Sequence, residues 1–188
     1  MADEAPVRFI ERQDWLEPVE TGVQKAVETA FHSTGETGQK VQDALHGKWL
    51  GHPLHPALTD IPTGAWTATL VLDLMEASGR TDLGPGADVA LTVGLVGAAS
   101  AALPGLTDWH VTEGSARRVG IVHGILNVVG TVLYTASLME RRKRNRSAGR
   151  ALAFAGFAVV AMSAYLGGNL VFRQGAGTEG GAEANQSA

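Results

Sequence analysis

Residues 119–139 read VGIVHGILNVVGTVLYTASLM, and this apolar stretch decides the fold class. It is about as long as a helix must be to cross a hydrocarbon core of roughly 30 Å. Three further stretches have the same character, and they cover residues 54–75, 89–106 and 151–172. All are too long for ordinary strands and lack the alternation of a membrane barrel. Their backbone hydrogen bonds must therefore close within helices.

The four stretches predict an all-α membrane protein, in which residues 49–173 form an up-and-down bundle of four transmembrane helices. A soluble bundle of four buried helices is the alternative interpretation. It would need a polar face on every helix, and the second and fourth stretches have almost no polar residues. The sequence therefore favours a transmembrane bundle over a soluble one.

The two ends of the chain are polar and differ from each other. Within residues 1–48, apolar residues such as Trp15 and Val19 recur at helical spacing, and acidic residues such as Glu20 occupy the other face, which predicts an amphipathic helix. Residues 174–188 are small, polar and glycine-rich, and we expect them to be disordered. The acidic start of the chain has no apolar core of a signal peptide.

Composition and missing motifs exclude several classes of function. The net charge of −4 argues against a nucleic-acid partner. The chain has no cysteine, which excludes disulfides, iron–sulfur clusters and thiol catalysis by its own residues. No P-loop, dinucleotide-binding glycine motif or hydrolase triad order is present. We therefore expect no stand-alone enzyme.

Basic residues predict the orientation in the membrane, because positively charged loops remain in the cytoplasm. The loop at residues 140–150 is the most basic, so we expect it to be cytoplasmic and both termini to be extracytoplasmic. Its basic residues are Arg141, Arg142, Lys143, Arg144, Arg146 and Arg150.

Polar residues of the four stretches gather at their outer ends. Since ionisable groups within a membrane rarely face lipid, this clustering predicts a histidine-lined pocket in the outer leaflet. Its candidate residues are His52, His55, Asp60, Asp108, His123 and Asn127.

The sequence GHPLHP at residues 51–56 resembles the signature of an uncharacterised group of bacterial four-span membrane proteins. The Thr107-Asp108-Trp109 segment, His123 with Asn127, and Gly167-Gly168 are similar to that group as well, and the resemblance covers about residues 41–177. It implies a multi-pass protein of the bacterial inner membrane. Some relatives are fused to a Rieske domain, which implies an electron-transfer context. Without cysteines, this chain would need a separate redox partner.

One hypothesis for the pocket is a b-type haem between helices, with His55 and His123 as the axial ligands. Arg117 and Arg118 would meet the propionates, and Asn127 follows His123 on the same helix face. The lipid bilayer would surround the protein, and a quinone or a redox protein would exchange electrons with it.

Two other hypotheses stay open from the sequence alone. The first is a divalent metal site built from His52, His55 and His123 with Asp60 or Asp108. The second is a structural anchor or scaffold without a cofactor, in which the polar residues only hydrogen-bond the helices to one another.

Overall fold

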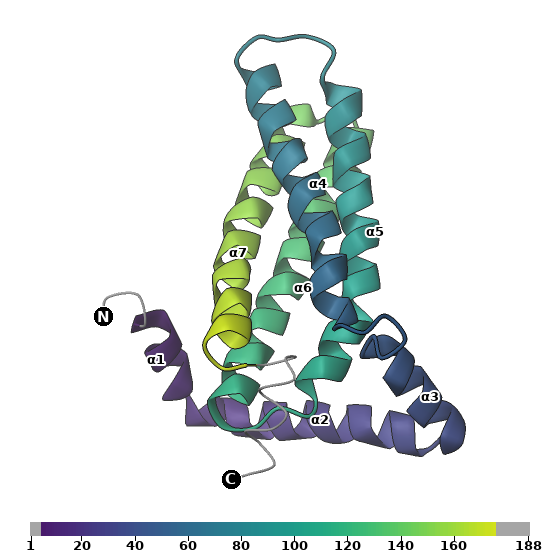
Figure 1. Ribbon diagram of the computed structural model, residues 1–188. Coiled ribbons are helices and arrows are strands. Elements are labelled where there is room, and N and C mark those ends of the chain that lie inside the picture. The colour runs from purple at the N-terminus through teal and green to yellow at the C-terminus, as the bar shows by residue number, and fades with distance from the viewer. Residues whose placement is uncertain (1–4, 176–188) are drawn as a thin grey trace. The chain divides into compact units, whose positions relative to one another are not determined.

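The computed structural model describes residues 5–175, and over these residues it is helical without strands. The tail predicted to be disordered lies mostly outside the described residues. Figure 1 shows the helices in chain order. They are α1 (Ala5–Glu11), the 3-10 helix η2 (Asp14–Leu16), α2 (Glu17–His32), α3 (Glu36–Leu45), α4 (Leu54–Ala77), α5 (Gly84–Trp109), α6 (Gly114–Arg142) and α7 (Arg146–Phe172).

Three of the described helices are long and apolar enough to span a membrane, namely α5, α6 and α7. The sequence predicted four spans, so the structure supports this prediction only in part. Helix α4 has 24 residues and is long enough. Over a membrane-length stretch it is less apolar than the other three long helices, because Asp60, Asp73 and Glu76 interrupt its apolar residues.

The chain forms two compact units. Among the described residues, unit 1 contains residues 5–55, 102–125 and 163–175, and unit 2 contains Pro56–Ala101 and Leu126–Met162.

An aromatic stack lies at the core of unit 2. Trp66 of α4 and Tyr134 of α6 stack with centroids 4.1 Å apart and planes 12° apart, and Leu91 and Ala153 complete the buried cluster. Pro62 lies inside α4, and its ring is buried. The aromatic stack joins α4 to α6 within this unit.

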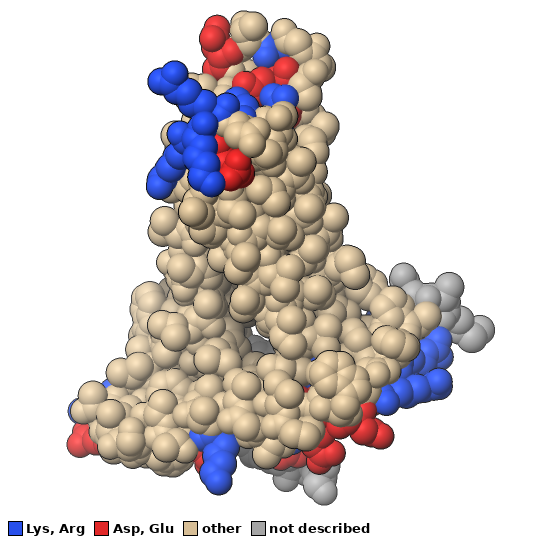
Figure 2. Space-filling view, turned by 180° about the vertical axis from the view of Figure 1, so that it is seen from behind, with Lys and Arg blue, Asp and Glu red and all other residues tan. Residues whose placement is uncertain are grey.

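Charged residues gather at one end of unit 2, as the blue and red atoms at the top of Figure 2 show. Arg141 of α6 donates to Asp73 of α4 at 3.0 Å and to Asp88 of α5 at 3.1 Å. Arg146 of α7 donates to Glu76 at 2.9 Å and to Asp88 at 3.1 Å. Arg141 and Arg146 were both predicted to lie in a basic loop. Carboxylates of α4 and α5 therefore neutralise part of the charge of that segment.

In unit 1, helix α2 lies across the segments contributed by α5, α6 and α7 (Figure 1). Helix α2 lies in the segment for which the sequence predicts an amphipathic helix, but one residue assigned to its polar face is not exposed. Glu20 is fully buried, and it accepts hydrogen bonds from Arg117 at 3.0 Å and Arg118 at 3.3 Å. Because two guanidinium groups stabilise the buried carboxylate, a charged residue can face the interior here.

Candidate functional site

The GHPLHP segment forms the start of α4. Helix α4 begins at Leu54, so Pro56 lies in its first turn, where a missing backbone N–H costs no helical hydrogen bond. His52 precedes the helix and is exposed, and its Nδ1 lies 3.2 Å from the carbonyl oxygen of Pro53. His55 lies within the first turn and is half-buried. The two histidines of the motif therefore have different surroundings.

The structure brings His55 together with His123 of α6, and both belong to unit 1. Their ring centroids are 6.5 Å apart, and the two ring planes are nearly perpendicular at 86°. The pair that the sequence singled out as axial ligands is thus close in space, although 67 residues separate them in the chain.

Ser163 of α7 fixes the ring of His123. The Nδ1 atom lies 2.8 Å from the Ser163 carbonyl oxygen, and since a carbonyl only accepts, Nδ1 carries the proton. The Ser163 hydroxyl lies 2.9 Å from the same Nδ1 and donates to the His123 carbonyl at 3.0 Å. In a neutral imidazole this tautomer places the lone pair on Nε2. Metal-binding histidines are commonly oriented in this way.

Two glycines make room for the two imidazoles. A Cβ atom on Gly105 of α5 would lie 2.6 Å from Cε1 of His55, and a Cβ on Gly167 of α7 would lie 2.9 Å from Cε1 of His123. Both distances are too short for a real contact. Each ring therefore lies directly against the backbone of a neighbouring helix, and any larger residue at either glycine would displace it.

An internal repeat relates the two histidines. Residues 55–70 read HPALTDIPTGAWTATL, and residues 123–138 read HGILNVVGTVLYTASL. In this alignment His55 matches His123, and the aromatic Trp66 matches Tyr134. The same separation of 68 positions relates Asp73 to Arg141.

Equivalent positions of the repeat make equivalent contacts. In unit 2, Gly94 lies against the indole of Trp66 and Gly156 against the ring of Tyr134, just as glycines receive the two histidines in unit 1. The glycines were not predicted as site residues. The repeat was the signal that could have found them, because it assigns each ring a glycine at a matching position of α5 or α7.

The other predicted site residues have partners elsewhere or lie in the other unit. Arg117 and Arg118 are held by Glu20, and Arg118 also donates to the backbone of Glu11 at 2.7 Å. Asp108 accepts from Nδ1 of His46 at 2.8 Å. Asp60, which is exposed, and Asn127, which is half-buried, belong to unit 2.

The described part of the chain contains no group of three or more histidine, aspartate or glutamate residues that could hold a metal ion. Of the predicted metal ligands, His55 and His123 lie close together, with their rings nearly perpendicular. The donor set for a compact tetrahedral site is therefore not assembled within residues 5–175.

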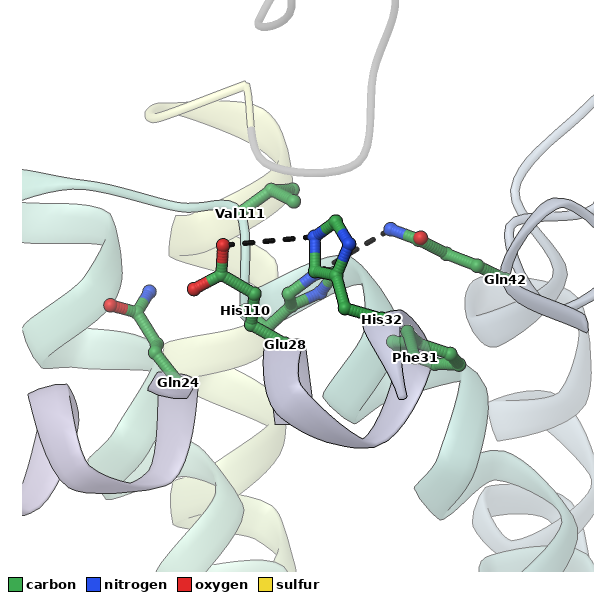
Figure 3. Close-up of a pocket in the computed structure, with 7 residues that line it drawn as sticks. All are labelled: Gln24, Glu28, Phe31, His32, Gln42, His110 and Val111. Atoms are coloured by element: carbon green, nitrogen blue, oxygen red, sulfur yellow. Dashed lines mark hydrogen bonds and ion pairs between the residues drawn. The ribbon is translucent and has the colours of Figure 1, made fainter. Parts of the chain in front are cut away.

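A separate pocket of about 350 Å³ lies in unit 1 between α2, α3 and the turn after α5 (Figure 3). His110 is held there through Nδ1, which lies 2.6 Å from the Thr107 carbonyl, and its Nε2 lies 3.4 Å from the Gln42 side chain. His32 pairs with Glu28 at 3.8 Å on the exposed side. The pocket is lined by Gln24, Glu28, Phe31, His32, Gln42, His110 and Val111.

Comparison with known proteins supports the membrane assignment. No curated protein and no solved structure matches the chain. Residues 51–180, which include the histidine motif and all of α4 to α7, match a family described as "Predicted membrane protein (DUF2231)". Because this match covers more than half of the chain, the protein belongs to the DUF2231 family of predicted membrane proteins.

Proposed function

We propose that this membrane protein binds a b-type haem through His55 and His123 and takes part in electron transfer. The observation that carries the proposal is the pairing of two imidazoles from α4 and α6, with centroids 6.5 Å apart. Two imidazoles from neighbouring helices that lie this close together could both hold one metal ion. The spacing of the pair fits a shared metal ion.

The orientation of His123 supports a role as ligand. Its Nδ1 proton is held by the Ser163 carbonyl, so the Nε2 lone pair is the one that can bind a metal. The repeat supports the same role for both residues, because it puts the two histidines in equivalent positions, each against a glycine. Histidines that served only to join helices would not require this equivalence.

The residues also limit what the site can do. A haem held by both His55 and His123 would supply one-electron chemistry, which favours electron transfer over oxygen chemistry. Arg117 and Arg118 have Glu20 as their partner, so the proposal rests on the histidines and not on arginines for the propionates. A quinone or a separate redox protein would exchange the electron.

The same proposal includes a fourth span. Two of the carboxylates that make α4 polar are paired within unit 2, since Asp73 bonds Arg141 and Glu76 bonds Arg146. This pairing lowers the cost of placing α4 in a membrane. With four spans in an inner membrane, the basic segment at residues 140–150 would face the cytoplasm and both termini the outside.

A visible absorption spectrum tests the haem. The full-length chain is purified in detergent from haem-supplemented cells, and spectra are taken after air oxidation and after dithionite reduction. The proposal predicts a Soret band and sharp α and β bands on reduction. A folded protein without these bands, containing no iron, would overturn the proposal and leave the structural anchor as the better account.

A further inference from the structure

The segment before α4 exposes large apolar side chains. Phe9 is 67% exposed, Trp15 is 68% exposed and Trp49 is 69% exposed. Surface aromatic residues in such number typically mark a binding surface, because leaving them in water is unfavourable. All three belong to unit 1.

Helix α2 has three distinct faces. One face turns toward the rest of unit 1 and includes the buried Glu20, and the buried Leu16 of η2 precedes it. A second face is apolar and exposed, and a third is charged and exposed. The apolar face consists of Val19, Gly22, Ala26 and Ala30, with Trp15 of η2 just before it, and the charged face includes Glu17, Lys25 and Glu28.

The position of α2 within unit 1 is fixed by bonds to α6 and to the turn before it. Buried Glu20 holds Arg117 and Arg118, and Gln24 donates to the Thr112 carbonyl at 2.8 Å. Because α2 lies across the ends of helices that are apolar enough to span a membrane, it runs along the surface that those helices enter. A helix in this position meets the headgroup region.

We infer that α1, α2 and α3 lie in the headgroup region of the bilayer, with the apolar face of α2 and the exposed aromatic residues against lipid. Tryptophan favours this depth, since its ring is apolar and its N–H remains near water. Figure 2 shows uncharged side chains over most of the face that unit 1 presents, with charged side chains along its lower and right-hand margins.

The charge of helix α2 indicates that its membrane contact does not require anionic lipid. Surface helices that bind membranes on their own usually have a basic polar face. The charged face of α2 carries two glutamates for its one lysine. Since the ion pairs of Glu20 already attach α2 to α6, the helix needs no electrostatic attraction to the membrane.

Spin labelling tests this inference. Because the sequence has no cysteine, each introduced cysteine is the one site that the label modifies. Val19→Cys and Ala26→Cys place a nitroxide on the apolar face, and Lys25→Cys and Glu28→Cys are matched controls on the charged face of the same helix. All four residues are exposed, so the labels displace no core side chain. The full-length variants are reconstituted into phosphatidylcholine vesicles.

The readout is the accessibility of each label to oxygen, which concentrates in lipid, and to a water-soluble nickel complex. Labels at 19 and 26 should be several-fold more accessible to oxygen than to nickel, and labels at 25 and 28 should show the reverse. Equal nickel accessibility on both faces would place α2 in water. Low accessibility to both reagents at 19 and 26 would mean that protein covers this face. Either result would overturn the inference, and neither depends on haem binding.

Discussion

Asp73 and Arg141 form an ion pair from which solvent is excluded. Both guanidinium ends donate to the carboxylate, one of them at 3.0 Å, and both side chains are fully buried. In unit 2 this pair joins α4 to α6 in a segment where an isolated charge would be costly. We regard it as the main polar connection between these two helices.

Asp73→Asn should lower the free energy of unfolding by about 3 kcal/mol, because it leaves the buried Arg141 charge without its main partner. Replacing both residues by leucine should recover most of the loss. Unfolding in detergent followed by circular dichroism measures both effects. Glu140→Gln is the control, since water screens the pair of Glu140 with the exposed Lys143 and its loss should have little effect. Equal losses for Asp73→Asn and Glu140→Gln would contradict this account.

Tyr134→Phe should leave stability unchanged or raise it by up to about 1 kcal/mol. The hydroxyl is buried and has no hydrogen-bond partner among the described residues, so its removal relieves a desolvation cost. Tyr134→Ala should instead cost about 3–5 kcal/mol, because the stack with Trp66 is lost. Thermal unfolding of both variants measures this difference. A clear loss of stability in Tyr134→Phe would indicate a water or ligand bound to the hydroxyl.

Gly167→Ala should displace the ring of His123 and reduce haem content at least tenfold, because the new Cβ would lie 2.9 Å from the imidazole. Gly124→Ala is the matched control in α6. No atom lies within 4 Å of its Cβ position, so the gain in helix propensity of about 1 kcal/mol should be the main effect. Haem content and melting temperature of the two variants measure this contrast. Normal haem content in Gly167→Ala would contradict the role of the glycine.

Labelling of single cysteines should reveal the orientation. Lys143→Cys lies between α6 and α7, and Glu113→Cys lies between α5 and α6, and both residues are exposed. With the basic segment in the cytoplasm, a membrane-impermeant maleimide applied to intact spheroplasts should modify position 113 and not 143. Inverted vesicles should give the opposite pattern. Modification of both positions from one side would mean that α6 does not span the membrane.

The helices were largely predictable from the sequence, and their charged ends were not. Apolar stretches predicted α5, α6 and α7, because a stretch without the alternation of a barrel strand can satisfy its backbone in lipid only as a helix. The predicted apolar stretch at residues 119–139 ends before helix α6 does. The helix continues to Arg142, and Arg141 is buried. A hydropathy scale treats every charged residue as solvent-exposed. It takes no account of the ion pair with Asp73 that allows Arg141 to be buried.

The histidine pair was predicted from its placement near the helix ends, and its surroundings were not. Gly105 and Gly167 have no functional side chain, so a search for reactive residues overlooks them. Only the repeat or the structure shows that His55 and His123 pack against them. Arg117 and Arg118 were assigned to a ligand because their partner Glu20 lies about 97 residues away and was placed on a polar helix face.

The spectra of three histidine variants test the central claim most directly. Haem content and the reduced-minus-oxidised spectrum are measured for His55→Ala, His123→Ala and His52→Ala, with circular dichroism to confirm folding. His52 is exposed and lies in the same motif, so it is the matched control. The account predicts that each of the first two variants loses the bis-histidine spectrum and that His52→Ala keeps it. A spectrum that survives in folded His55→Ala and His123→Ala would show that these residues are not the ligands.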